Sequence, residues 1–494
     1  MGAERIKIPF SELDRVSDNR KMSFAPTGVS FSTADGKWQR VFDAAERTEK
    51  NNIVLWHGKR VLVEGGVYQG LWLETQPMGG DMYSDRCPET AWNNQNIFID
   101  LIRDDWRIPS VIRFEDDGAE VMYSHFQGYC FPYHALNVWY RTGKDMHYLN
   151  RLYDCLSRFD SYLWRTRDTD GNGCLESFCV WDTGEDGSTR FFGAPDAWGS
   201  DTPPYGQAKL PYESMDIMAY CYDGRVTLSE IAAILGNGEE KKWRDGAEAV
   251  RKTLNSYLWR EEKGALYDRD CDNNFLDTLI HNNLRVMYHG AYEYDKAMRF
   301  VREHLLNPEE FFTPMPLTSI AANDRLFVSD PDNNWSGQPE GLTYQRSLRA
   351  FENYRLYDLL PVFGQKLCGA LAQNDPVIFT QQFDPYTGKP QAAFCTATGD
   401  YGPTILAFLG YTSHLYGVEL VRDTAVFSTC PVSGGCEYTL TVGEKAFTVK
   451  NDGRKATVSV DGREIITVPA GTRVVTDAGG NLIKTYPAFS GTDA

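Results

Sequence analysis

The chain has 494 residues, a net charge of −18 and a globular composition, with 42% hydrophobic and 24% charged residues. This length allows one large domain with an appendage, or two to four domains of ordinary size. The acidic balance argues against nucleic acid, which is bound mainly through Lys and Arg contacts to phosphate, and against anionic membrane surfaces. A neutral or cationic small ligand fits better, and the 12 Trp and 27 Tyr supply rings of the kind that stack on sugars.

The cysteines and the apolar runs indicate the compartment. The eleven cysteines are scattered without CxxC pairs or Cys/His clusters, which argues against a disulfide framework and a structural zinc site. No stretch approaches the ~18 apolar residues of a membrane span, and the N-terminus lacks an apolar run of signal-peptide length. We therefore expect a cytoplasmic protein with reduced thiols.

The residue pattern predicts three parts in chain order. Residues 1–75 contain short alternating stretches broken by turn signals, which predict an N-terminal segment of strands and loops. From about Asn93 to about Gly417 the hydrophobic spacing is helical, so that residues 76–417 are predicted to form a helical domain. Residues 418–494 return to short alternating runs such as EYTLTVGEKAFTVK, which predict a small antiparallel β domain.

The helical part predicts a closed architecture. Helix pairs recur without strands between them, which excludes a βαβ fold. A solenoid or a closed toroid remains, and the absence of a fixed-period consensus favours the toroid, whose loops gather around a cleft at one end. The connections at 165–213 and 311–340 are long and rich in Gly, Pro, Asp and Trp. Loops of this length are usually functional, so we expect the active site there.

The segment from Asp168 to Trp198 carries the densest chemistry. It combines carboxylates and tryptophans with Arg190, the mixture that a sugar-cleaving enzyme needs to protonate a leaving oxygen and to hold a pyranose. A solvated acidic loop is the alternative interpretation. The start of the segment, DTDGNG, is similar to a calcium loop, but its twelfth position is Cys179 instead of glutamate. An EF-hand is therefore excluded, and no metal is expected.

Within this segment, TGEDGSTRF at 183–191 resembles the general-acid motif S-G-x-D-x-S-x-R-W of the inverting glycosidases of clan G, namely the trehalases and glycoside hydrolase family 63. The aspartate of the motif falls on Asp186. Other segments resemble the family in the same order: GGDMYSD, SHFQGYCFPYHALNVWYRTGK, DNNWSGQPEGLTYQRSLRAFENY and QQFDPYTGKPQAAFCTATGDYGPTILAFLGY.

The resemblance covers about residues 70 to 420. It implies an (α/α)6 barrel, the cleavage of α-glucosidic or related bonds with inversion, and no metal or cofactor. Asp186 would be the general acid, and Arg190 would orient a carboxylate or a hydroxyl. The terminal sugar subsite would be lined by Asp81, Tyr83, Gln127, Trp181 and Trp335.

The chain departs from the family at the catalytic base. The family has the glutamate of E-K/N-Y-D, whereas this chain has Gln381, which cannot accept a proton from water at neutral pH and is expected to hydrogen-bond sugar or water. Glu340 in WSGQPEG, or with lower preference Asp400 in TATGDYG, would supply the base, because an inverting enzyme needs only two carboxyl groups ~6.5–9.5 Å apart. Glu340 has an alternative role as the cap of the helix that begins near Leu342. Phosphate as the nucleophile, and a loss of catalysis by evolution or by a deliberate Glu-to-Gln change, are the other interpretations.

We therefore predict an exo-acting, inverting glycoside hydrolase for small α-linked oligosaccharides or glycosides. A glycoside phosphorylase, a carbohydrate-binding protein without activity and a sugar epimerase on the same barrel are the alternatives. An epimerase of this type relies on paired histidines, and the sequence offers no convincing pair. Glu213 and Asp216 stand at a helix start, where they contact substrate or serve the helix dipole. The sequence leaves the sugar and the oligomeric state open.

Overall fold

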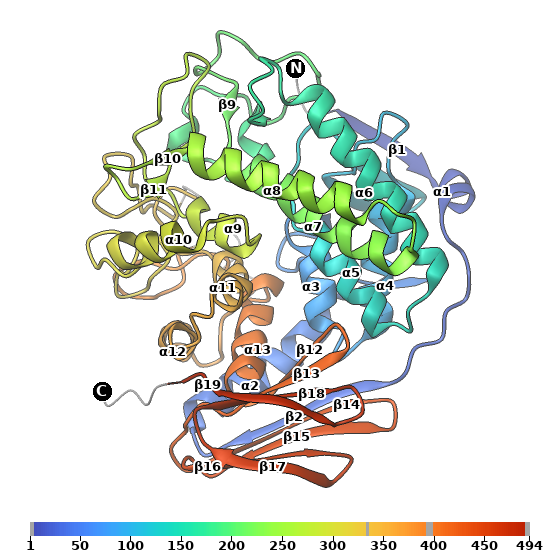
Figure 1. Cartoon of the computed structure of the whole chain (residues 1–494), viewed down its shortest axis with the longest axis vertical. Coiled ribbons are helices and arrows are strands. Elements are labelled where there is room, and N and C mark those ends of the chain that lie inside the picture. The colour runs from blue at the N-terminus through green and yellow to red at the C-terminus, as the bar shows by residue number, and fades with distance from the viewer. Residues whose placement is uncertain (1–3, 332–334, 392–398, 490–494) are drawn as a thin grey trace.

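The computed structural model describes residues 4–331, 335–391 and 399–489. Helices fill the middle of the chain, and the C-terminal strands form a separate layer beside them (Figure 1). Within the described ranges, no helix combines the length and the apolar character that a membrane crossing requires.

Six helices contact one another in a closed order and form what we call the inner ring. Each contacts the next, and the last contacts the first. They are α3 (Gln76–Tyr83), α5 (Phe131–Arg141), α7 (Met215–Leu235), α9 (Asn282–Tyr288), α11 (Gly341–Asn353) and α13 (Gly402–Tyr416). Helices buried on all sides tolerate apolar residues all round, and α13 accordingly contains no Asp, Glu, Lys or Arg.

A second set of helices covers the ring from outside. Helix α2 packs on α13, α4 on α3 and α5, α6 on α5 and α7, α8 on α7, and α12 on α11 and α13. They span Gly36–Thr48 (α2), Pro88–Asp100 (α4), Met146–Thr166 (α6), Glu240–Tyr257 (α8) and Leu359–Leu371 (α12), while α10 (Tyr294–Phe300) follows α9 and continues as a π-helical turn, Val301–Leu305. Helix α8 shows the amphipathic pattern, because Trp243, Ala247, Val250 and Leu254 are buried at helical spacing.

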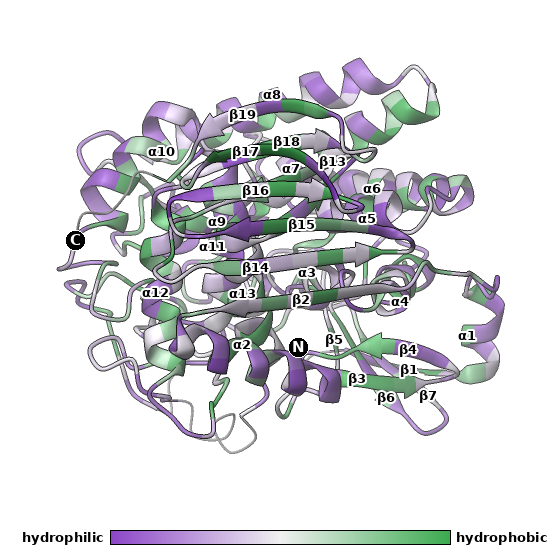
Figure 2. Cartoon of the chain, turned by 90° about the horizontal axis from the view of Figure 1, so that it is seen from below, coloured by the Kyte–Doolittle hydropathy of each residue, from purple (hydrophilic) through white to green (hydrophobic). Residues whose placement is uncertain are grey.

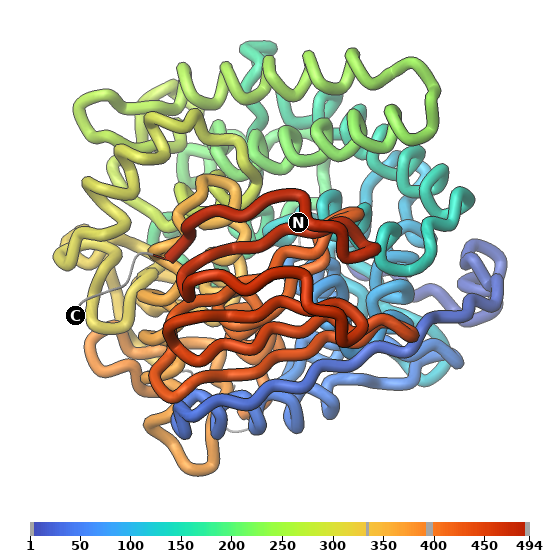
Figure 3. The backbone as a smooth tube through the Cα atoms, turned by 60° about the horizontal axis from the view of Figure 1, so that its bottom comes forward, coloured from blue at the N-terminus to red at the C-terminus, as the bar shows by residue number. Residues whose placement is uncertain are grey.

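The C-terminal strands form two antiparallel sheets. One has the order β12-β13-β18-β19 and the other β17-β16-β15-β14-β2, and Figure 2 shows the second sheet face on. The strands are β12 (Val418–Val421), β13 (Thr424–Ser428), β14 (Cys436–Val442), β15 (Lys445–Asn451), β16 (Lys455–Val460), β17 (Arg463–Pro469), β18 (Thr472–Asp477) and β19 (Leu482–Pro487). Strand β2 (Thr27–Thr33) comes from the N-terminal segment and pairs with β14, from Thr33 opposite Cys436 to Thr27 opposite Val442 (Figure 3).

The first 75 residues therefore do not form a unit of their own. Strand β1 (Arg5–Pro9) pairs with β7 (Gly118–Met122), which belongs to the middle of the chain. Their sheet has the order β1-β7-β6-β5, with β6 (Val111–Glu115) and β5 (Gly70–Trp72). The remaining short elements are α1 (Phe10–Val16), η1 (Glu49–Asn52), η2 (Val180–Asp182), η3 (Thr189–Phe191) and the two-stranded sheets β3 (Ile53–Trp56) with β4 (Lys59–Leu62), β8 (Glu176–Ser177) with β9 (Tyr212–Glu213), and β10 (Trp259–Arg260) with β11 (Ala265–Leu266).

The expectation of strands and loops in the N-terminal segment was wrong for Gly36–Thr48, which is helix α2. Asp35 caps this helix by accepting hydrogen bonds from the backbone N–H groups of Lys37 and Trp38. Trp38, Val41, Phe42 and Ala45 are buried at the spacing of one helix face. The N-cap and the helical spacing of these apolar residues favour a helix here, although the strand that precedes it has an alternating pattern.

Candidate active site

The residues that precede the inner helices meet at one end of the ring. Gln127, before α5, donates a hydrogen bond from Nε2 to Oε1 of Glu74, before α3, at 2.9 Å. Gln382, in the segment before α13, donates from Nε2 to Oε1 of Glu340, before α11, also at 2.9 Å. Burial raises the pKa of Tyr401, the residue before α13, and the charges of Glu74 and Glu340 raise it further. The N-terminal ends of these helices therefore surround a common cluster of carboxyl groups.

Asp186 lies at this cluster. Its Oδ1 is buried and has no hydrogen-bond partner among the described residues. Burial, followed by the negative charges of Glu74 and Asp196, raises the pKa of Asp186 to about 8. A carboxyl group with this pKa keeps its proton at neutral pH and can donate it to a leaving group.

Glycine lets the loop that carries Asp186 pass close to Glu74. Gly184 has a φ of +71°, and a Cβ atom there would lie 2.6 Å from Oε2 of Glu74. At Gly128, with a φ of +56°, a Cβ atom would lie 3.0 Å from the same oxygen. Because neither position accepts a side chain, these glycines fix the approach of Glu74 to the loop.

Glu74 and Glu64 are members of the cluster that sequence reasoning missed. Burial raises the pKa of Glu64 well above its ordinary value, and the charges of Glu74 and Asp186 raise it further. Burial also raises the pKa of Glu74, against the opposing charge of Arg346, whose Nη2 lies 3.5 Å from Oε2 of Glu74. The available signal was a carboxylate directly after each of the apolar runs VLV and LWL, because buried charged residues are rare without a partner or a function.

Glu340 is fully buried and does not cap helix α11. It stands at the N-cap position, but its side chain makes no capping hydrogen bond, so the capping role is not realised. Its Oε1 accepts from Gln382, and its Oε2 is buried without a hydrogen-bond partner among the described residues. Burial raises the pKa of Glu340 well above its ordinary value, although hydrogen bonds from Gln382 and from the backbone of Trp335 oppose the shift.

Gln381 lies beside this group. The Tyr68 hydroxyl donates to Oε1 of Gln381 at 3.0 Å, and the backbone carbonyl of Gln381 accepts from the N–H of Gly341, the first residue of α11. The neighbouring Gln382, which the sequence analysis did not single out, holds Glu340 instead.

The two tryptophans predicted to line the subsite differ in exposure. The carbonyl of Trp181 accepts a hydrogen bond from the backbone N–H of Gln127 at 2.8 Å, and its half-buried ring meets that of His125 edge to face. Trp335 is only 2% exposed, and its ring centre lies 5.4 Å from the Arg285 guanidinium. Of the two, Trp181 has the more accessible ring for stacking on a sugar.

Arg190 binds the carboxylates of Glu185 and Asp268. Its Nη2 lies 2.5 Å from Glu185, and its Nη1 lies 2.8 Å from Asp268. Asn282, at the start of α9, donates to both Glu185 and Asp216. This network places the loop before Asp186 against α7 and α9.

Two of the predicted site residues, Asp81 and Tyr83, are not brought to this cluster. Asp81 lies seven residues beyond Glu74, ~10 Å along α3 at 1.5 Å per residue, and contacts His134 Nδ1 at 2.8 Å and Asn137 Nδ2 at 2.7 Å. Tyr83 lies at the far end of α3. The short motif that placed both residues at the subsite therefore failed, because the helix carries them away from its N-terminal end.

Asp400 stands directly before Tyr401, the residue that precedes α13. Its backbone carbonyl accepts from Asn52 Nδ2 at 3.0 Å, and its charge acts on the carboxyl of Glu49. The charge of Asp186 acts on Glu340, which supports Glu340 as the second carboxyl, and the role of Asp400 stays a prediction.

The segment that is similar to a calcium loop is a hydrogen-bonded turn. Oδ1 of Asp168 accepts from the backbone of Gly173, and Oδ1 of Asp170 from that of Asn172, both at 3.1 Å. The Asn172 amide also donates to Glu213, which ties the turn to strand β9. In the part of the chain that the structure describes, no group of three or more His, Cys, Asp and Glu residues is arranged to hold a metal ion.

A proton-bearing carboxyl that faces further buried carboxyls at one end of a helical ring is the arrangement of a glycoside hydrolase. Residues 88–402 match the family model of the mannosylglycerate hydrolase MGH1-like glycoside hydrolase domain. The chain belongs to this family of glycoside hydrolases and has the six-hairpin glycosidase fold. No curated protein matches its sequence.

Solved structures share the fold at low identity. The glycoside hydrolase family 63 mannosylglycerate hydrolase of Thermus thermophilus, in complex with glucose, is 14% identical, with a TM-score of 0.59 over 75% of this chain and 99% of its own. The neutral trehalase of Saccharomyces cerevisiae is 12% identical, with a TM-score of 0.54 over 75% of this chain and 79% of its own. A family 78 rhamnosidase of Bacillus sp. GL1 is 12% identical, with a TM-score of 0.58 over 88% of this chain and 41% of its own.

Proposed function

We propose that the protein is an exo-acting, inverting glycoside hydrolase on an (α/α)6 toroid, and that it cleaves α-glucosidic or related α-glycosidic bonds of small glycosides. Asp186 protonates the glycosidic oxygen, and Glu340 activates the attacking water. The observation that carries the proposal is the partly buried carboxyl of Asp186, whose Oδ1 is buried without a partner among the described residues and whose pKa is raised to about 8.

The free oxygens of the two carboxyls support this division of roles. Oε1 of Glu340 is held by Gln382, which leaves Oε2 to take the proton of a water molecule. Burial raises the pKa of Glu340, so this group ionises at a higher pH than an ordinary glutamate, while Asp186 keeps its proton up to about pH 8. Activity requires Glu340 without and Asp186 with a proton, so we expect its acid limb to lie above the range of an ordinary glutamate and its alkaline limb at about pH 8.

The substrate class follows from the enclosure of the site and from the relatives. The carboxyls of Glu64, Glu74 and Glu340 are all at least nine-tenths buried, which suits a terminal sugar better than the middle of a polymer. Solved structures of similar fold include a mannosylglycerate hydrolase, a trehalase and a rhamnosidase. Gln127 and Trp181 bind the sugar beside Asp186, and Gln381 binds sugar or water.

The test is hydrolysis of mannosylglycerate, trehalose and nitrophenyl α-glycosides by the wild type, Asp186→Asn and Glu340→Gln, with and without phosphate. We expect each variant to lose roughly 10²–10⁴-fold in kcat, because each removes one proton-transferring group. NMR detection of the first-formed anomer tests inversion.

The remaining outcomes discriminate among the alternatives. An active Asp186→Asn enzyme would contradict the proposal. Full activity of Glu340→Gln would move the base elsewhere, and turnover that requires phosphate would indicate a phosphorylase. Sugar binding by the wild type without turnover of any substrate would indicate a carbohydrate-binding protein.

A further inference from the structure

A cavity of about 570 Å³ lies at the other end of the inner ring, a volume within the range of small-molecule sites. Helices α3, α5, α9, α11 and α13 line it, and strands β12, β13, β18 and β19 cover it. The wall of this cavity contains none of the carboxyl groups of the active-site cluster, namely those of Glu64, Glu74, Asp186 and Glu340. The cavity is therefore distinct from the active site and bridges the helical part and the C-terminal sheet.

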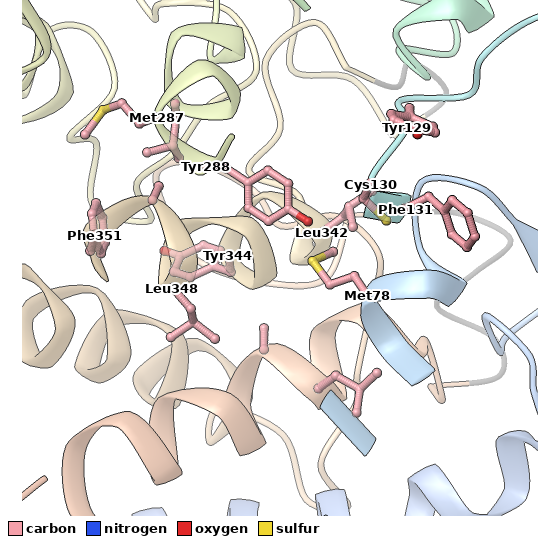
Figure 4. Packing of buried hydrophobic residues seen from close by; sticks show 14 of the residues in the cluster. Met78, Tyr129, Cys130, Phe131, Met287, Tyr288, Leu342, Tyr344, Leu348 and Phe351 are labelled. Carbon is pink, nitrogen blue, oxygen red and sulfur yellow. The ribbon is translucent and has the colours of Figure 1, made fainter. Parts of the chain in front are cut away.

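Part of the wall is apolar and aromatic. Met78, Tyr288 and Leu348, which come from α3, α9 and α11 and are labelled in Figure 4, line the cavity. Leu406 and Leu409 of α13 extend this surface. Such a surface accepts the C–H face of a sugar ring or of another polyol.

Most charged side chains of the wall are already paired. Arg349 binds Asp223 at 2.9 Å, and Arg473 binds Glu352 at 2.6 Å. The other pairs are Arg141 with Asp85, Arg86 with Glu46, His134 with Asp81, and His414 with Glu419. Lys484 also lines the cavity, but it is exposed and contacts the ring of Tyr486. Because the less exposed charges have their counter-charges, a charged ligand inside the cavity would lose its hydration without gaining a free partner there.

Some hydrogen-bonding atoms of the wall residues remain without partners. Oδ1 of Asn137 and Oε1 of Gln345 are buried and have no partner among the described residues, and these two residues are only 7% and 2% exposed. The Nε atoms of Arg349 and Arg473 are likewise buried without a hydrogen-bond acceptor among the described residues. Because an unsatisfied buried polar atom is destabilising, these amide oxygens and Nε–H groups favour a molecule in the cavity that can both donate and accept hydrogen bonds.

We propose that this cavity binds a neutral polyhydroxylated molecule of the size of a small sugar. A hydroxyl can both donate to the amide oxygens of Asn137 and Gln345 and accept from the arginine Nε atoms. The paired charges inside the cavity disfavour acids and amines, and the apolar wall takes the ring face. The bound molecule joins the inner ring to strands β18 and β19, and the proposal stands independently of the reaction proposed for Asp186.

The test uses D-glucose as the probe, with D-glucuronate and D-glucosamine as its charged counterparts. Crystals of the whole chain are soaked in each sugar, and saturation-transfer NMR measures binding to the wild type, Gln345→Leu and Trp181→Ala. Gln345→Leu removes one acceptor of the cavity, and its Nε2 has only a 3.3 Å contact to the Met82 sulfur to lose. Trp181→Ala is the matched change at the active site.

We expect glucose density in the cavity, no density there for the charged sugars, and at least a tenfold loss of cavity binding in Gln345→Leu but not in Trp181→Ala. Leu348→Trp, which fills the cavity, gives the same loss without removing a polar group. Ordered water alone in the cavity of glucose-soaked wild-type crystals would overturn the proposal, and so would binding of glucuronate or glucosamine as strong as that of glucose. These readouts are sugar density and sugar binding at the cavity, so a loss of activity in Asp186→Asn would not change them.

Discussion

The two ends of the inner ring bury charge in opposite ways. At the N-terminal end, Glu64, Glu74, Asp186 and Glu340 crowd together, and burial raises the pKa of each. At the C-terminal end most charged side chains are paired, and Asp223, the partner of Arg349, has a side chain that is only 2% exposed. One end is therefore arranged for proton transfer at the expense of stability, and the other compensates its buried charges, so that breaking a pair there is destabilising.

At the N-terminal end of the inner ring, helix dipoles alone would lower the pKa values of the carboxyl groups instead of raising them. The N-terminal ends of helices carry partial positive charge, which favours ionised carboxylates by ~0.3–1 kcal/mol near the surface. The carboxyl pKa values nevertheless rise, so burial and mutual repulsion outweigh the dipoles. At the C-terminal end, where the dipoles favour cations, Arg141 and Arg349 lie in the last turn of α5 and in the latter half of α11.

The largest effect is expected from breaking a pair at the C-terminal end. In Arg349→Met, Asp223 keeps only His289, at 3.0 Å, as a partner and remains buried. The free energy of unfolding should fall by about 3–5 kcal/mol, because removing one partner leaves a buried charge uncompensated. Denaturant unfolding measures it.

The matched control for that change is Arg244→Met. Arg244 pairs with Glu240 at 2.6 Å on the exposed face of α8, where a pair contributes ~0–1 kcal/mol. Equal losses of stability in the two variants would contradict the distinction between the ends.

A change at the N-terminal end should act in the opposite direction. Glu340→Gln replaces a buried carboxyl by a neutral amide, and we expect it to raise the free energy of unfolding by about 1–2 kcal/mol at pH 8. The folded-state pKa of Glu340 is raised, so the folded state holds a proton that the unfolded state releases above ~4.3. The wild type therefore loses stability as the pH rises above that value, and the gain in the variant grows with pH.

Thermal unfolding of both proteins at pH 4 and pH 8 measures that gain. Glu444→Gln, at an exposed position of the hairpin between β14 and β15, should change neither value. A Glu340→Gln protein that is less stable than the wild type at pH 8 would contradict the expected gain.

Sequence patterns predicted the helical middle of the chain, the C-terminal strands, and Asp186, which lies in a short contiguous motif. Helical spacing in the middle of the chain and alternation after Val418 both appear in the structure, and TGEDGSTRF located Asp186 in the carboxyl cluster. These patterns are read within a few residues, so no knowledge of distant contacts is needed.

Long-range contacts explain what the sequence did not predict. Strand β2 pairs with β14, which lies some four hundred residues later in the chain. The residues of β2 themselves contain no pattern that predicts this partner. Glu64 and Glu74 join the site only because the ring closes between α13 and α3. Asp81 was placed at the site by the resemblance of the short segment GGDMYSD to a family motif, although the direction of α3 carries it to the other end.

The smallest effect tests how the cluster sets the proton of Asp186. Glu74→Gln removes the charge that, after burial, contributes most to the raised pKa of Asp186. That pKa should fall by up to about one unit, or ~1.4 kcal/mol, so the alkaline fall of kcat/KM should move from about pH 8 to lower pH. Asp196→Asn, at an exposed position, removes the second of these charges, and its shift should have the same sign and be smaller. An alkaline limb that stays in place in Glu74→Gln, or moves to higher pH, would show that burial alone holds the proton on Asp186.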